Sequence, residues 1–284
     1  MAIPDYKTPS ANLVSKAYLI ASYPRSGSTW LRLMLANLIA GQGVGINELD
    51  LPWISSREVF DLVLGFSSSD LTSQELDNLR APVYHSILAG FRQKTFVKVH
   101  DQNRTAGQDQ LFGGAGVAGV IYLCRHPADV CVSLANHLGI SLQESLERMN
   151  DSDFALFDSV ESLGQVYTRL GTWSGHINSY LNAGGLRLLT IRYEDLFRFP
   201  EMILNQVGRF AGLNCSRVSA AVAATTFEKL RRAEKEQGFR EGAGGTTPFF
   251  RAGHPGQGQV LLNTCQLHQL ETTHKDTMRI IAYL

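Results

Sequence analysis

Short apolar runs alternate along the chain with longer segments in which apolar residues recur at helical spacing. The four clearest runs are Ala17–Tyr23, Thr95–Val99, Gly119–Cys124 and Leu186–Ile191. Each is rich in aliphatic or aromatic residues and is followed by polar or turn residues, which is typical of buried strands. Buried strands separated by helices form parallel sheets. The pattern therefore predicts an α/β fold with a central parallel sheet flanked by helices.

Helical spacing is clearest in Leu31–Ile39 and in Cys265–Leu284. Two pairs of residues match the capping box, in which side chains bond the free backbone donors of a helix start: Thr72 with Glu75, and Ser141 with Glu144. The segment 238–258 differs from the rest because it is rich in glycine and contains Phe249, Phe250 and Arg251. It is either a surface loop without fixed structure or a mobile segment that orders over a ligand.

The 284 residues, of which 44% are hydrophobic, suit one α/β domain that spans residues 1–284. The 26 basic and 26 acidic residues cancel, which disfavours broad binding to nucleic acid or to a membrane. One concentrated basic pocket remains compatible with this balance. The polar residues 1–10 do not resemble a secretory signal, and no apolar run approaches the ~18 residues of a membrane span. A cytoplasmic location is expected.

The four cysteines form no C-x-x-C pair, and no His/Cys cluster has zinc spacing. No metal site is therefore expected. Cys124 falls in a predicted buried strand and Cys131 in a predicted helix, which favours small buried thiols in a reducing compartment over a disulfide.

The strongest local pattern follows the first predicted strand, where a turn from Ser22 to Trp30 leads into an amphipathic helix. Backbone N–H groups at such a junction point at one place, and the helix dipole adds positive potential, so an anion site is predicted. Arg25 supplies a positive charge, and Gly27 lets the backbone approach a ligand. Small hydroxyl side chains line the turn: Ser26, Ser28 and Thr29. The pattern G-x-x-x-x-G-K-[ST] is absent, which argues against a magnesium-dependent kinase or GTPase.

The segment Tyr-Pro-Arg-Ser-Gly-Ser-Thr-Trp, which ends at Trp30, resembles the 5′-phosphosulfate loop Y-P-K-S-G-T-T-W of sulfotransferases. These enzymes use 3′-phosphoadenosine-5′-phosphosulfate (PAPS) and release PAP. Arg25 stands where cytosolic members of the family carry lysine, although other branches carry arginine there. A guanidinium neutralises charge on a bridging oxygen but is a poor proton donor. The replacement therefore puts in doubt whether residue 25 can act as a general acid, as the family's lysine does, more than it puts the activity in doubt.

A second pattern, Arg-His-Pro-Ala-Asp-Val-Cys-Val-Ser, begins at Arg125 and ends at Ser133. It resembles the family's 3′-phosphate motif R-x-P-x-D-x-x-x-S. Arg125 at a strand end and Ser133 two turns into the next helix can converge on one phosphate. The alternative is that Arg125 forms a structural ion pair with Asp129.

Weaker matches to the family lie elsewhere. Lys98-Val99-His100 resembles K-T-H, whose histidine is the catalytic base, and the alternation along a strand puts Lys98 and His100 on one face. Two further segments resemble adenine-pocket motifs and contain Tyr193 and Phe227, although the second is equally compatible with an ordinary helix start. The late segment F-x-R-K-G-x-x-G is matched by Arg251, Ala252 and Gly253, where Ala252 replaces the usual lysine and removes one charge contact.

Taken together, the resemblance spans residues 18 to about 260. It implies a P-loop-like sulfotransferase fold in which His100, Lys98 and Arg25 are catalytic and the sulfuryl group of PAPS passes to a hydroxyl of a small-molecule acceptor, without a metal. Two alternatives are a non-catalytic module that binds PAP or another nucleotide, and a small-molecule kinase on a related fold. Stabilisation by PAP or by ATP with magnesium would distinguish them. The acceptor and the oligomeric state are not encoded in any pattern.

Overall fold

The computed structural model describes residues 16–41, 43–49, 51–113, 116–156, 164–242 and 248–284. Its main sheet has four strands in the order β2-β1-β5-β8. These strands are β1 (Ala17–Ser22), β2 (Thr95–Val99), β5 (Val117–Cys124) and β8 (Leu188–Arg192). Two short antiparallel pairs lie outside this sheet: β3 (Thr105–Ala106) with β4 (Asp109–Gln110), and β6 (Ala155–Leu156) with β7 (Thr168–Arg169). The predicted fold class, a central parallel sheet flanked by helices, is confirmed.

Strands β1 and β2 coincide closely with the predicted runs because their sequences are apolar along almost their whole length. All six residues of β1 are buried, and β1 pairs with β2 in parallel, with Leu19 opposite Val97. The free edge of β2 is covered, since the Lys98 N–H donates to the Pro52 carbonyl and the Ile54 N–H donates to the Lys98 carbonyl. Such coverage protects a sheet edge from further pairing. β5 begins two residues before the predicted run, and β8 is shifted by one to two residues.

The chain divides into two compact units, which are described separately. The first comprises Met1–Tyr23, Leu51–Tyr122 and Asp151–Leu189. The second comprises Pro24–Asp50, Leu123–Asn150 and Thr190–Leu284. The sequence-based expectation of one domain over residues 1–284 stays a prediction.

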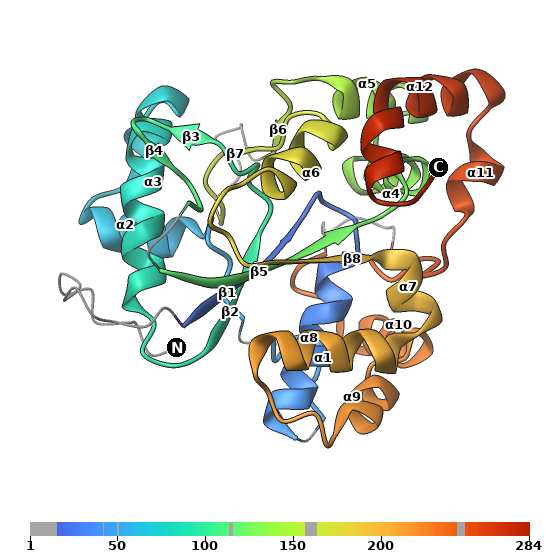
Figure 1. Cartoon of the computed structure of the whole chain (residues 1–284), viewed down its shortest axis with the longest axis horizontal. Coiled ribbons are helices and arrows are strands. Elements are labelled where there is room, and N and C mark those ends of the chain that lie inside the picture. Colours follow the sequence, from blue (N-terminus) through green and yellow to red (C-terminus); the bar gives the residue numbers. More distant parts are fainter. Residues whose placement is uncertain (1–15, 42, 50, 114–115, 157–163, 243–247) are drawn as a thin grey trace. The chain divides into compact units, whose positions relative to one another are not determined.

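The helices of the first unit are α2 (Arg57–Leu64), the 3₁₀ helix η1 (Ser68–Asp70), α3 (Ser73–Gly90) and α6 (Trp173–Leu181). In Figure 1, α3 lies beside α2 and beside the β3–β4 pair, in agreement with their contacts. The predicted capping box at the start of α3 is present: the Thr72 N–H donates to a Glu75 carboxylate oxygen, and the Glu75 N–H donates to Thr72 Oγ1.

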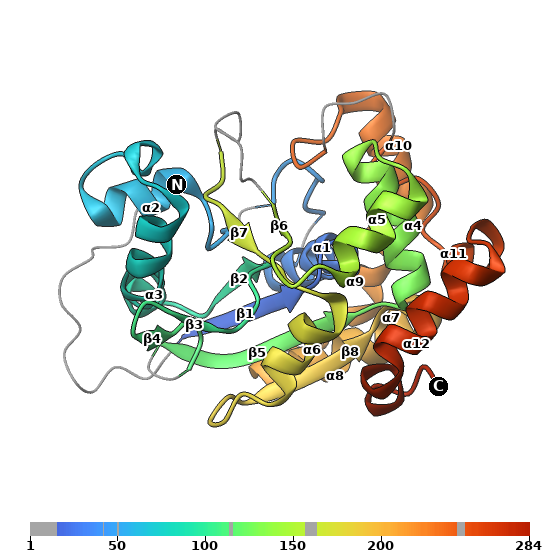
Figure 2. The ribbon, with the colours of Figure 1, turned by 90° about the horizontal axis from the view of Figure 1, so that it is seen from above.

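The second unit contains the remaining helices. They are α1 (Ser28–Ala40), α4 (Pro127–Leu138), α5 (Leu142–Asn150), α7 (Tyr193–Arg198), α8 (Pro200–Ala211), α9 (Val218–Ala224), α10 (Phe227–Gln237), α11 (Gln257–Leu261) and α12 (Thr264–Ile280). Helix α1 packs on α8 and α9, whereas α4 packs on α5, α11 and α12 (Figure 2). At the start of α5, the Glu144 N–H donates to Ser141 Oγ, but the Glu144 carboxylate pairs with Arg148 rather than completing the predicted box.

Cys124 and Cys131 are buried thiols, as predicted, and none of the four cysteines forms a disulfide in the described residues. Within the same ranges, the helices lack the combination of length and apolar character that crossing a bilayer requires.

Candidate functional site

The turn between β1 and α1 has a backbone shaped for close approach to a ligand. Gly27 caps α1 with a φ of 97°, and Arg25 has a φ of 69°, a left-handed conformation that is uncommon for a residue with a side chain. Ser28 and Thr29 form the first turn of α1 and are buried, and this turn contains no acidic residue. Its backbone N–H groups and the positive end of the helix dipole therefore favour an anion.

The Arg25 side chain reaches the second predicted phosphate motif. Its Nε donates to Ser133 Oγ on α4 at 3.1 Å, and its Cζ lies 4.4 Å from the centroid of the Phe249 ring. Although part of the residue reaches solvent, burial of the guanidinium lowers the pKa of Arg25 to about 10, helped by the positive charges of Arg125 and Arg251. Arg25 remains a cation at neutral pH, so three like charges share one region of the second unit.

Arg125 is the second of these cations. Its Nη1 donates to the Arg25 carbonyl at 3.3 Å, and its Cζ lies 4.4 Å from the centroid of the Tyr193 ring. The alternative ion pair is also present, since Arg125 Nη2 lies 3.5 Å from Asp129 Oδ2. The Arg125 Nε is buried and has no hydrogen-bond partner among the described residues. The ion pair and a phosphate contact are therefore compatible, because they use different nitrogens of one guanidinium.

The segment that carries Arg251 is held in place by two carboxylates. The Glu234 carboxylate on α10 accepts the N–H groups of Phe249 and Phe250 at 2.6 and 2.9 Å. The Asp129 carboxylate on α4 accepts the N–H groups of Gly256 and Gly258 at 2.9 and 2.7 Å. Residues 248–258 thus have fixed partners, and Phe250 belongs to a buried apolar cluster with Leu33, Ile46 and Leu230.

Aromatic rings lie in close contact with the two glycines of the predicted motifs, Gly27 and Gly253. A Cβ added at Gly27 would lie 2.5 Å from Cδ2 of Tyr193, and one at Gly253 would lie 2.3 Å from Cδ2 of Phe227. The Tyr193 hydroxyl donates to the Gly253 carbonyl at 2.5 Å, and the rings of Trp30 and Tyr193 are 6.2 Å apart. Trp30 and the predicted adenine-pocket residues Tyr193 and Phe227 therefore lie close to the glycines of the predicted phosphate motifs. Ala252 adds no polar group to this region.

The residue types of this region fit a phosphate- or sulfate-bearing ligand. Three guanidinium groups repel one another, and a multivalent anion would relieve that repulsion. The Ser26 hydroxyl is fully buried and, like the Arg125 Nε, has no hydrogen-bond partner among the described residues. Buried donors of this kind are rarely left unpaired in folded proteins. Over the described residues, His, Cys, Asp and Glu form no group that could hold a metal ion.

Lys98 and His100 lie in the first unit, at the end of β2. The His100 Nδ1 is 2.8 Å from the carbonyl oxygen of Ser22, the last residue of β1. A carbonyl only accepts hydrogen bonds, so Nδ1 carries the hydrogen and, in a neutral ring, Nε2 is the basic nitrogen. The Lys98 Nζ lies 3.3 Å from the centroid of the Trp53 ring, which also contacts His100 edge to face at 6.3 Å.

Comparison with known proteins connects this geometry to a family. The profile of the sulfotransferase domain matches residues 115–280, more than half of the chain. The chain belongs to the sulfotransferase domain family. Human sulfotransferase 2B1 is 28% identical over 222 residues, which cover 75% of this chain and 51% of the human protein. This sulfotransferase-family chain thus spans about half the length of that curated relative.

Solved sulfotransferase-type structures share the fold. Retinol dehydratase in complex with androsterone and PAP superposes with a TM-score of 0.61 and 18% identity, over 94% of this chain and 82% of that one. Mouse sulfotransferase SULT7A1 complexed with PAP superposes with a TM-score of 0.59 and 16% identity, over 94% of this chain and 86% of that one. At these identities the likeness establishes the fold.

Sequence reasoning missed several contacts that the predicted site residues make. Glu234 and the packing of Phe249 on Arg25 depend on contacts between residues far apart in the chain. For Trp53, the loop 51–54 predicts a place either in the core or beside the acceptor, and the side chain lies against both Lys98 and His100. The one available signal was the adjacent pair Phe249-Phe250 in a glycine-rich segment. This pair indicated that the segment could become ordered, but it did not indicate that Phe249 packs on Arg25.

Proposed function

We propose that this chain transfers the sulfuryl group of PAPS to a hydroxyl group of a small-molecule acceptor and releases PAP. The observation that carries the proposal is a group of three guanidiniums in a member of the sulfotransferase family: Arg25 donates to the Ser133 hydroxyl and lies within the electrostatic influence of Arg125 and Arg251. PAPS carries anionic groups at both the 3′ and the 5′ position of its ribose, and a site with several cations suits that charge. Complexes of the same fold with PAP support this assignment.

In this proposal the residues of the second unit bind the nucleotide. Arg125, Ser133 and Arg251 would hold the 3′-phosphate, in part through the Arg125 Nε. The turn Ser26–Thr29 and Arg25 would bind the 5′-phosphosulfate, and Trp30, Tyr193 and Phe227 would flank the adenine. PAPS supplies the sulfuryl group when bound. No metal is needed, because backbone N–H groups and guanidiniums would stabilise the negative charge.

The residues of the first unit would handle the acceptor. The Nε2 lone pair of His100 would take the proton of the acceptor hydroxyl while that oxygen forms its bond to sulfur and the bond from sulfur to the nucleotide phosphate breaks. The leaving phosphate oxygen retains the electron pair of the broken bond, and Lys98 would offset the charge that develops. Structures of the same fold in complex with androsterone and with retinol, which are both small alcohols, favour a hydroxyl acceptor.

Transfer from radiolabelled PAPS to a panel of alcohols, phenols and amines tests this function. We expect labelled product with at least one hydroxyl compound, and a loss in the His100→Ala variant on the order of 10²–10⁴ in turnover. PAP affinity of that variant should stay within about threefold of the original, because His100 contacts the acceptor rather than the nucleotide. His268→Ala, which alters an exposed histidine on α12, is the matched control. Full activity of the His100 variant would remove His100 from the mechanism, and transfer to amines alone would refute the acceptor class.

A further inference from the structure

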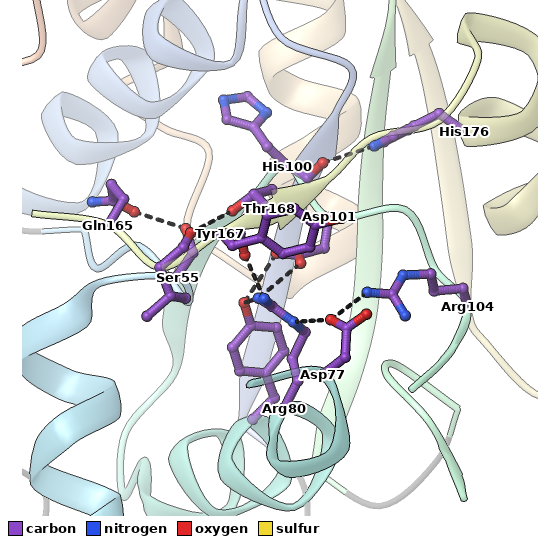
Figure 3. A network of polar contacts seen from close by, with 12 residues as sticks. Ser55, Asp77, Arg80, His100, Asp101, Arg104, Gln165, Tyr167, Thr168 and His176 are labelled. Atoms are coloured by element: carbon purple, nitrogen blue, oxygen red, sulfur yellow. Dashed lines mark hydrogen bonds and ion pairs between the residues drawn. The ribbon is translucent and has the colours of Figure 1, made fainter. Parts of the chain in front are cut away.

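A buried charged cluster lies immediately beyond His100 (Figure 3). Arg80, on α3, has its Nη1 3.2 Å from Asp101 Oδ1, and the Tyr84 hydroxyl donates to Asp101 Oδ2 at 3.0 Å. Arg80, Tyr84 and Asp101 are each fully buried. Arg80 also donates to the Tyr167 carbonyl and pairs with Asp77, which in turn pairs with Arg104 at 2.7 Å. The Asp101 carboxylate is therefore held by two donors from one rigid helix.

The main chain on either side of this carboxylate is held as well. The His176 Nε2 donates to the His100 carbonyl at 2.9 Å, and the Tyr180 hydroxyl donates to the Asp101 carbonyl at 2.8 Å, both from α6. The His100 carbonyl only accepts, so His176 Nε2 carries the hydrogen. Burial lowers the pKa of His176 to about 4, which keeps the ring neutral, so its Nδ1 accepts the hydrogen of the Tyr122 hydroxyl at 2.7 Å. The main chain of residues 100 and 101 is thus bonded to α6, and the Asp101 side chain is bonded to α3.

The His100 ring itself has its orienting bond to the Ser22 carbonyl. That bond keeps a single geometry as long as the distance between the Cα of residue 100 and the end of β1 is fixed. His100 lies one residue beyond the last residue of β2. The bonds of residues 100 and 101 to α3 and α6 constrain the backbone at this point.

Such a cluster is a weak source of stability. Burial raises the pKa of the Asp101 carboxyl, and the Arg80 guanidinium and the Tyr84 hydroxyl oppose that rise because both favour the ionised form. Replacing buried ion pairs by apolar residues is often neutral or stabilising, so the benefit of these charges lies in the geometry that they specify. The geometry they specify here is that of the residue next to the proposed base.

We propose that Asp101, locked by Arg80 and Tyr84, is a positioning residue that fixes the orientation and tautomer of the His100 ring. The inference rests on the proposed function in its catalytic consequence, because His100 is the base only if the chain is a sulfotransferase. Misplacing a reacting group by about 1 Å can cost on the order of 10² in rate. Asp101 is fully buried and acts through His100, so its loss should lower kcat and leave nucleotide binding unchanged.

The test uses nitrogen NMR of histidine-labelled full-length protein, with the His100 signals assigned from their absence in His100→Gln. In the unaltered protein we expect a single Nδ1–H tautomer. In Asp101→Asn we expect a mixture of tautomers or broadened signals, together with a kcat lowered about 10- to 100-fold and a PAP affinity within threefold. Tyr84→Phe removes one hydroxyl donor to Asp101 and should shift both readouts in the same direction by a smaller factor.

Arg104→Gln is the matched control, because it breaks the Arg104–Asp77 pair in the same cluster without removing a bond to Asp101. It should leave the His100 tautomer and kcat unchanged. An unaltered His100 tautomer in folded Asp101→Asn or Tyr84→Phe would overturn the proposal, as would equal losses in Arg104→Gln. PAP binding to the unaltered protein is measured separately, so failure of the proposed function shows as absent binding and leaves the tautomer result interpretable.

Discussion

Arg25 combines two features that a folded protein rarely tolerates together. Its backbone is left-handed, which costs on the order of 1–2 kcal/mol for a residue with a Cβ, and its guanidinium is desolvated near two like charges. Strain of this kind concentrates at functional sites. The planar guanidinium of Arg25 donates sideways from Nε to Ser133 while its face lies over the Phe249 ring, a combination that suits the flat shape of arginine.

The buried histidines make the stability of the fold depend on pH. Burial lowers the pKa of His176 to about 4, whereas an unfolded histidine titrates near 6.5. Between these values the unfolded chain binds more protons, so the free energy of unfolding falls as the pH is lowered. For His176 alone the decrease from pH 7 to pH 5 is about 2 kcal/mol. His274, whose pKa burial also lowers to about 4, adds a decrease of the same sign.

Urea unfolding at pH 7 and pH 5 measures this effect. In His176→Gln, a side chain that can still donate to the His100 carbonyl but does not titrate, the decrease should be smaller by about 2 kcal/mol. A variant whose pH dependence matches that of the original protein would show that His176 titrates normally in the folded state.

At the scale of elements, hydrogen bonds in the second unit hold the loop 248–258 against the start of α4. Asp129, in the first turn of α4, accepts two N–H groups from residues 256 and 258, and a Cβ at Gly258 would lie 2.3 Å from the backbone of Ala128. Glu234 on α10 holds the other end of the loop. The helix that bears Ser133 thereby also positions Arg251.

Replacing Asp129 with Asn tests this attachment. One acceptor oxygen and the charge facing Arg125 are lost, so the loop should loosen and PAP affinity should fall about 10- to 100-fold. Titration calorimetry gives the affinity, and proteolysis of residues 248–258 reports the loosening. Asp195→Asn, which breaks a more exposed pair with Arg192, is the control and should bind PAP normally. Unchanged affinity and protease resistance in the Asp129 variant would contradict the attachment.

The sequence predicts those features that depend on residues close together in the chain. The apolar runs of β1 and β2 and the cap of α3 depend on neighbouring residues, and they were predicted to within a residue. The two-residue strands β3, β4, β6 and β7 carry no periodicity and were not foreseen. The predicted phosphate motifs are visible in the sequence because short loops carry their residues in order. The pairing of Arg80 with Asp101, 21 residues apart, has no such pattern, because burial of a charge pair depends on tertiary packing.

At the scale of the whole molecule, a net charge of zero conceals a local excess of positive charge. Arg25, Arg125 and Arg251 gather in the second unit, whereas the first unit buries its charges in pairs such as Arg80 with Asp101. A small anionic nucleotide can therefore bind without a general attraction to polyanions. The central claim is that this cationic cluster recognises the 3′-phosphate that separates PAP from ordinary adenine nucleotides.

Calorimetric titration with PAP and with adenosine 5′-monophosphate, which differ only in the 3′-phosphate, tests that claim most directly. We predict that PAP binds roughly 100-fold more tightly, and that Arg125→Ala removes most of this preference while Arg198→Ala, an exposed arginine on α7, retains it. Equal affinity for the two nucleotides, or an undiminished preference in Arg125→Ala, would contradict the account.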